Sequence, residues 1–206
     1  MNKHGIDKQQ ERFEIYQLLW HYYRGDLQNL TVGEWATVAA FLSSKPSLSQ
    51  NDWGAKAINL LETINNQSLE TFQFDYNRLF VGPNKLLASP YESSYTNIEG
   101  TVMQAETLKV RNFYYHEGLQ VDREGQYPDD HLQFELEFIL HLFRFEEKKD
   151  ILQLFLHNHL LKWYEAHCRR IEEHSQNGLT LAFAYFLRGF LQQETMLLKQ
   201  EEAALC

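Results

Sequence analysis

The chain has few of the residues that interrupt helices. Its 206 residues include 10 glycines and 4 prolines, whereas 14 phenylalanines, 11 tyrosines and 4 tryptophans supply large apolar side chains. No segment alternates apolar and polar residues over the length that a half-buried strand requires. These absences argue against a turn-rich β-fold and predict an all-α protein, a single helical-bundle domain over residues 1–206 with about eight to ten helices.

Cysteines and long apolar runs are also scarce. Cys168 and Cys206 are the two cysteines, and their wide separation argues against a disulfide framework or a paired-cysteine zinc site. The N-terminal residues lack the apolar stretch of an export signal, and the apolar run from Leu179 to Leu187 is too short to span a bilayer. The expected location is therefore the cytoplasm.

Motifs for catalysis and cofactor binding are missing. The sequence has no glycine-rich phosphate loop and no G-x-S-x-G nucleophile turn. No histidine follows a glutamate by three residues, as carboxylate-bridged di-iron bundles need. The pairs His131–Glu135 and Glu137–His141 suit contacts on a helix surface better than a metal site. We therefore expect no metal, no cofactor and no enzymatic activity.

The chain is also poor in positive charge. Its formal net charge is −9, which argues against general affinity for nucleic acids or anionic membranes, because their phosphates require a basic surface. The acidic balance is compatible with a cationic partner such as a basic peptide.

Capping residues and helix breakers divide the chain into the expected helices. Several of these helices begin at a serine, threonine or aspartate that can accept bonds from free backbone N–H groups. The expected helices are one over about residues 8–24, one capped by Thr31 with Glu34 in a capping box, one opened by Ser49, one capped by Ser68, one from about Thr101 to His116, one beginning at Asp129 or Asp130, one from Asp150 to Ile171, and one after Asn177–Gly178.

Residues 126–140 combine the end of a loop with the start of a helix. Either Asp129 or Asp130 is expected to be the N-cap, because a carboxylate there accepts bonds from free backbone donors. His131 and Glu135 stand one turn apart, so acidic groups and an imidazole gather at one helix mouth. An ordinary helix cap explains the same residues, and the spacing leaves both interpretations open.

The loop from Gly82 to Tyr95 is unusual in its composition. Pro83 and Pro90 restrict its backbone, and Tyr91 offers a broad apolar ring with a polar tip. Long loops with aromatic residues in compact helical proteins are often binding surfaces. Packing of the tyrosines into the core beneath the loop is the alternative.

Two motifs resemble those of a known family when their order and spacing are considered together. The first is Tyr76-x-x-Leu79-Phe80-x-Gly82-Pro83 followed by Ser89-Pro90-Tyr91-Glu92-Ser93-x-Tyr95, and the second is Pro128-x-Asp130-His131 followed by Glu135-Leu136-x-Phe138. Further matches are Val110-Arg111-x-x-Tyr114, Gly118-Leu119 and His159-Leu160-x-x-Trp163. Over roughly residues 76–190 the chain resembles the TorD-like chaperones, which include the DmsD and NarJ relatives. It departs from them at Tyr127, where relatives commonly carry glutamate.

The resemblance implies an all-helical cytoplasmic chaperone for the maturation of a molybdenum-containing oxidoreductase. Its partners would be the apo-enzyme's catalytic subunit and the twin-arginine signal peptide of that subunit, held until the molybdenum cofactor is inserted. The chaperone itself would be a monomer or a domain-swapped dimer. The peptide-binding residues that the matched motifs imply are Pro83, Pro90, Tyr91, Glu92, Ser93, Tyr95, Asp129, Asp130, His131 and Glu135.

In this interpretation the carboxylates at the helix mouth accept charge-assisted hydrogen bonds from the peptide's arginines. The Gly82–Tyr95 loop is then expected to lie close to Asp130 and His131. The substitution Asp130→Asn is expected to weaken peptide binding without unfolding the protein, because asparagine caps a helix as well as aspartate. The alternatives are an assembly factor for a redox enzyme that is not exported, and a helical protein that binds a nucleotide or another small molecule.

Overall fold

The computed structural model describes residues 3–97, 105–122 and 127–205. In these ranges the regular structure consists of eleven α-helices and one short 3-10 helix, η1, without a β-strand. The predicted all-α class is confirmed, and nine of these α-helices are seven residues or longer. The chain folds as two compact units, unit 1 from Met1–Leu27 and Pro90–Trp163, and unit 2 from Gln28–Ser89 and Tyr164–Cys206. A single domain over residues 1–206 stays a prediction.

Unit 1 is built around a pair of packed helices and the aromatic residues between them. Its elements are α1 (Lys3–Arg24), α6 (Ser93–Thr96), α7 (Ala105–His116), α8 (Leu132–Leu142), η1 (Glu146–Lys148), α9 (Lys149–Asn158) and the first turn of α10 (Leu160–His174). Helix α1 packs against α8, and the ring of Phe143 lies 6.2 Å from that of Phe13 and 5.6 Å from that of Tyr16. These aromatic contacts fix α1 to α8, the helix that contains the second half of the second motif.

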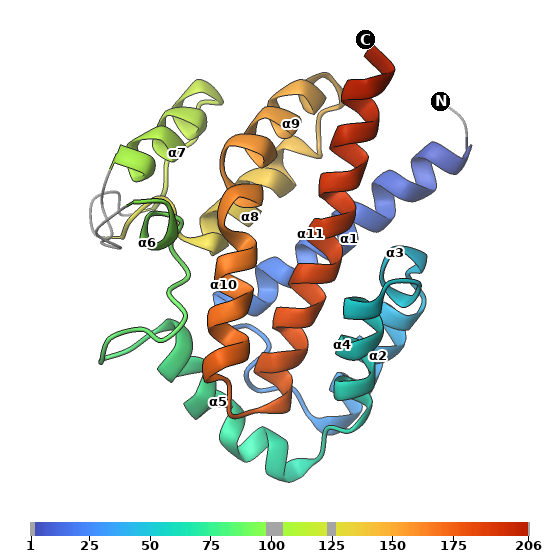
Figure 1. Cartoon of the computed structure of the whole chain (residues 1–206), viewed down its shortest axis with the longest axis vertical. Helices are drawn as coiled ribbons and strands as arrows, with labels where there is room; N and C mark the ends of the chain where they lie inside the picture. The colour runs from blue at the N-terminus through green and yellow to red at the C-terminus, as the bar shows by residue number, and fades with distance from the viewer. Residues whose placement is uncertain (1–2, 98–104, 123–126, 206) are drawn as a thin grey trace. The chain divides into compact units, whose positions relative to one another are not determined.

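Unit 2 is a helical bundle centred on the last helix. It contains α2 (Val32–Ser43), α3 (Pro46–Ser49), α4 (Asp52–Glu62), α5 (Asn66–Phe80), the rest of α10 and α11 (Gly178–Leu205). Helix α11 lies alongside α4 (Figure 1). A Cβ atom on Gly189 would lie 2.7 Å from Asn51 Oδ1, and one on Gly54 would lie 2.1 Å from the carbonyl oxygen of Leu48. The two glycines therefore permit an approach that a side chain would block.

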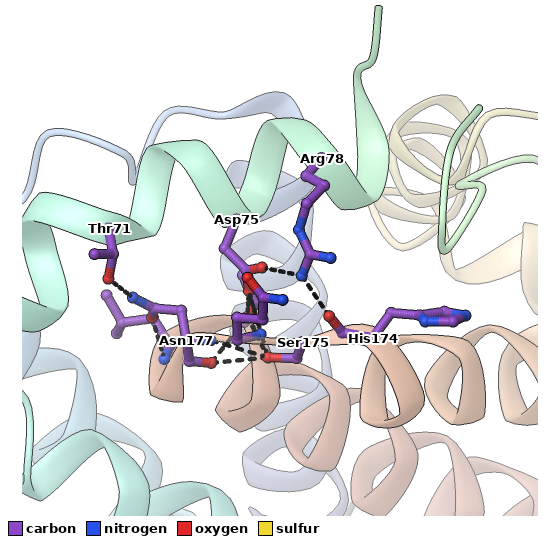
Figure 2. Close-up of polar contacts among 9 residues, drawn as sticks. Thr71, Asp75, Arg78, His174, Ser175 and Asn177 are labelled. Carbon is purple, nitrogen blue, oxygen red and sulfur yellow. Dashed lines mark hydrogen bonds and ion pairs between the residues drawn. The ribbon is translucent and has the colours of Figure 1, made fainter. Parts of the chain in front are cut away.

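A buried carboxylate joins α5 to the turn between α10 and α11 in unit 2. Asp75 is 2% exposed and accepts hydrogen bonds from Arg78, Thr180 and the backbone N–H of Gln176. Figure 2 shows Asp75 and Arg78 pointing from α5 toward this turn, where Arg78 also donates to the carbonyl of His174. A buried charge is stable only when it is paired and hydrogen-bonded, so this network fixes the turn.

The helix starts agree with the capping rules, although not always at the predicted residue. The capping box of Thr31 and Glu34 is confirmed. Helix α4 is capped by Asn51 rather than Ser49, because Ser49 ends the short helix α3. Helix α5 is capped by Asn65, and Ser68 completes its capping box at the third position. The start of the helix expected from about Thr101 lies outside the described residues.

The helix predicted from Asp150 to Ile171 is wrong in one respect, because it is two helices. His159 separates α9 from α10 with non-helical backbone angles, φ −124° and ψ −94°. Its imidazole Nδ1 lies 2.8 Å from Oε2 of Glu92, a long-range contact that sequence spacing does not reveal. The last helix begins after Asn177, as predicted. No helix among the described residues has the length and apolar character needed to cross a membrane.

Candidate functional site

The second motif begins α8, but its cap is not the predicted aspartate. His131 is the N-cap, and its Nδ1 accepts a hydrogen bond of 3.0 Å from the backbone N–H of Gln133. The expectation that Asp129 or Asp130 caps this helix is therefore wrong. Burial lowers the pKa of His131 to about 4, so at neutral pH its imidazole is uncharged and keeps the lone pair that the cap requires.

Asp130 instead connects the two motifs. Its Oδ2 accepts from the backbone N–H of Ser93 and its Oδ1 from the hydroxyl of Thr107, both at 2.8 Å. Its carbonyl oxygen accepts from the backbone N–H of Glu92 at 3.0 Å. The residue is 0% exposed. The carboxylate therefore holds α6 and α7 to the start of α8, and asparagine could not accept both side-chain bonds without reorganisation.

Asp129 forms the buried ion pair of this cluster. Its Oδ2 accepts from Arg111 on α7, 2.6 Å from Nη2 and 3.0 Å from Nε. The carbonyl oxygen of Asp129 accepts from the hydroxyl of Tyr114, which comes from the next turn of the same helix. Asp129 is 1% exposed. The two aspartates are thus both occupied by groups of their own chain.

The end of the first motif packs directly on the second. The backbone N–H of Leu132 donates to the carbonyl of Pro90 at 2.8 Å, and Tyr91 and His131 form an isolated antiparallel bridge. Their rings meet edge to face with 4.9 Å between centroids. Both side chains are half-buried. The tyrosine is therefore positioned by the cap of α8.

Two further acidic residues are buried in unit 1. Glu92, 2% exposed, pairs with His159. Glu135, 0% exposed, has Oε2 3.4 Å from Nε1 of Trp163, and Tyr95 stacks on the same indole at 5.4 Å. Burial, together with the charges of Glu92 and Asp130, raises the pKa of Glu135 well above its ordinary value. Both effects favour the uncharged form of the Glu135 carboxyl group.

The structure thus brings nine of the ten predicted site residues into unit 1. The residues in unit 1 are Pro90, Tyr91, Glu92, Ser93, Tyr95, Asp129, Asp130, His131 and Glu135. The expected proximity of the loop to Asp130 and His131 is confirmed for its second half, Pro90–Tyr95. Pro83, which follows a cis peptide bond, belongs to unit 2. A role for these ten residues in peptide binding stays a prediction.

Four residues of this cluster have no role assigned by the sequence patterns. Arg111, His159 and Trp163 occur in the matched motifs, and this occurrence is the one feature of the sequence that could have identified them as members of the cluster. Thr107 lies in no motif, and only the fold brings its hydroxyl to Asp130. The four form the hydrogen bonds and ion pairs that keep the acidic groups buried.

A pocket of about 610 Å³ also lies in unit 1, between α1, α8 and residues 119–122. Buried and half-buried aromatic residues form its apolar surface, among them Phe13, Trp20, Phe134 and Phe138. Exposed polar residues, including Gln17, Asp122, Glu137 and Arg144, stand around it. Pockets of this size with an apolar lining and a few polar groups suit small molecules or peptide segments. Among the described residues no group of three or more acidic, histidine or cysteine side chains is arranged to hold a metal ion.

Comparison with known proteins identifies the class. The family model described as nitrate reductase delta subunit matches residues 47–169, more than half of the chain, so the chain belongs to this family. This is the TorD family of redox-enzyme maturation chaperones, and the resemblance seen in the motifs is confirmed.

The individual relatives are named as chaperones. The chaperone protein TorD of Vibrio cholerae serotype O1 (strain O395) is 28% identical over 201 residues, with 90% of each chain covered. The TorD protein of Actinobacillus pleuropneumoniae serotype 3 is 28% identical over 170 residues, covering 82% of this chain and 83% of the relative. A probable Tat proofreading chaperone DmsD of Haemophilus influenzae is 27% identical over 123 residues, covering 60% and 59%. The chain is accordingly a chaperone rather than an enzyme.

Proposed function

We propose that this chain is a cytoplasmic chaperone that binds the twin-arginine signal peptide of a molybdenum-containing oxidoreductase and holds the apo-enzyme until its cofactor is inserted. The observation that carries the proposal is the similarity to TorD proteins over 90% of the chain, together with a relative named as a Tat proofreading chaperone. The net charge of −9 favours a partner with a cationic segment.

The buried cluster of unit 1 supports a binding role through organisation rather than direct ionic contact. Tyr91, Tyr95 and His131 are half-buried aromatic members of the cluster, and aromatic rings with polar tips suit a peptide that is partly apolar. The carboxylates of Asp129 and Asp130 hold the elements that carry these residues.

The test is a pull-down from native cytoplasm followed by calorimetry. The tagged chain is expected to retain a molybdenum-enzyme subunit with a twin-arginine leader, and the synthetic leader is expected to bind the purified chain. A control leader with both arginines replaced by alanine should bind more weakly. Recovery of no redox enzyme, or equal binding of both leaders, would contradict the proposal.

A second candidate is an assembly factor for a redox enzyme that is not exported. The name of the matching family model, which refers to a subunit of nitrate reductase rather than to export, favours keeping it. The same pull-down separates the candidates, because a retained subunit without a leader sequence supports this second function.

A further inference from the structure

We propose that the pocket between α1 and α8 is the docking site for the arginine-bearing, apolar segment of the client peptide, with Glu137 and Asp122 as the arginine acceptors. The proposal rests on the function proposed above and adds where the peptide binds. The two proposed acceptors, Glu137 and Asp122, are not among the residues that define either motif.

The carboxylates of the second motif are not available as arginine acceptors. An arginine that binds a chaperone reversibly needs a carboxylate that solvent can reach. Asp129 and Asp130 are 1% and 0% exposed and are bonded within their own chain, and Glu135 is 0% exposed. Replacing such internal bonds would leave buried donors unpaired, which is costly. The arginine acceptors must therefore lie elsewhere.

Two carboxylates that solvent can reach lie beside the pocket. Glu137 and Asp122 are exposed and line it. Neither carboxylate forms a hydrogen bond or ion pair with any residue that the structure describes. Gln133, one turn before Glu137 on α8, also lines the pocket, and its side-chain amide has no partner in the described ranges. A guanidinium can use such oxygens in planar, charge-assisted contacts.

The two helices present their pocket-lining residues at helical spacing. Phe13, Gln17, Trp20 and Arg24 follow one face of α1 at spacings of three and four residues. On α8, Phe134 and Phe138 are one turn apart and contribute the aromatic wall beside Gln133 and Glu137. Within the described chain the indole N–H of Trp20 is buried without an acceptor. An apolar peptide segment would cover the rings.

Some of the charged and titratable groups around the pocket already have partners. Arg24 lies over the ring of Trp20 at 4.3 Å, and its Nε is 3.6 Å from Asp26 Oδ2, so a carboxylate already offsets its charge. His141 faces Lys148 at 3.3 Å, and Lys148 pairs with Glu117 at 2.7 Å. Partial burial and the charge of this lysine lower the pKa of His141, so the imidazole is neutral at pH 7.

After these pairs are counted, two carboxylates and the guanidinium of Arg144 remain at the pocket. Their sum is −1, which complements an arginine-bearing segment better than an acidic one. A basic, apolar peptide is therefore the occupant that the lining favours.

The experiment combines a location readout with an affinity readout. A benzoylphenylalanine placed at Gln133 is expected to cross-link the synthetic leader, whereas the same group at Glu147, exposed in η1 of the same unit and outside the pocket, is not. Glu137→Gln should weaken leader binding by about three- to fivefold and the double substitution with Asp122→Asn by about tenfold, with smaller differences at high salt.

The matched control is Glu147→Gln, which makes the same charge change and should leave the affinity unaltered. If wild-type protein binds the leader but position 133 does not cross-link it and Glu137→Gln has no effect, this inference fails while the proposed function stands. Cross-linking of a second copy of the chain, in place of the leader, would also overturn it. If wild-type protein binds no leader, the proposed function itself fails.

Discussion

Two sets of acidic residues in unit 1 differ in what they touch. Asp129, Asp130 and Glu135, from the second motif, are buried, and the two aspartates bind groups from α6 and α7. Glu137, only two residues further along α8 than Glu135, is exposed at a pocket and has no partner among the described residues. The buried carboxylates therefore build the fold, whereas the exposed carboxylate of Glu137 remains available to a ligand.

Unit 2 shows that a buried, fully bonded aspartate is not by itself a binding site. Asp75 has the same low exposure as the aspartates of the second motif and fixes a turn between helices. Burial and saturation of hydrogen bonds are features of structural carboxylates. The acidic residues of the motif have these features, which is why we assign them to organisation.

The largest effect is expected for substitution of Asp130. Asp130→Ala leaves the N–H of Ser93 and the hydroxyl of Thr107 without their acceptor and should lower the free energy of unfolding by about 3 kcal/mol. Asp130→Asn should lower it by about 2 kcal/mol, because one of the two donors faces an NH₂ group. This replaces the expectation of unchanged stability, which assumed that Asp130 was the cap. Urea denaturation measures both values. An Asp130→Ala variant as stable as wild type would contradict a structural role for this buried carboxylate.

Acid is also expected to destabilise the fold, through His131. In the unfolded chain His131 takes up a proton near the ordinary histidine pKa of 6.5, whereas in the folded protein its pKa is about 4. Acid therefore favours the unfolded state, and the free energy of unfolding should fall as the pH decreases from about 6.5 toward 4.

The control for this pH effect is His131→Asn, which keeps a capping oxygen but does not titrate. Denaturation curves of this variant should depend less on pH in the same window. An equal dependence in both proteins would show that other groups dominate the acid response.

The smallest effect on stability is expected for Glu135→Gln. Because the folded protein raises the pKa of Glu135, the stability associated with its neutral form is complete below about 4.5 and is lost as the pH rises through the folded pKa. Glutamine keeps the neutral shape, so the free energy of unfolding should change by less than about 1 kcal/mol at pH 5. The variant should also lose less stability than wild type in denaturation curves at alkaline pH. A loss as large as that of Asp130→Asn would show that Glu135 is ionised and paired.

Sequence patterns predicted much of the fold. The scarcity of glycine and proline gave the all-α class, and local chemistry gave the capping box at Thr31 and the helix after Asn177. These features depend on neighbours within a few residues. The cap of α8 was mispredicted because Asp130 is used by Ser93, 37 residues earlier in the chain. Local propensity cannot rank two adjacent capping candidates when a distant donor takes one of them.

The candidate site was predictable in part for the same reason. The motifs named the residues that meet at Tyr91 and His131, but not the hydroxyl of Thr107 that completes the cluster. The α1–α8 pocket was not foreseen, since no sequence pattern pairs Trp20 with Glu137. Tertiary packing alone brings these helix faces together.

The most direct test of the account is a charge exchange between Glu137 and the peptide, measured by calorimetric titration. Wild-type protein should bind the arginine leader more tightly than a leader whose two arginines are replaced by glutamate. Glu137→Arg, shown by its melting curve to be folded, should reduce this preference by at least about tenfold, because it weakens one complex and strengthens the other. The same preference in both proteins would contradict a role for Glu137 as an arginine acceptor.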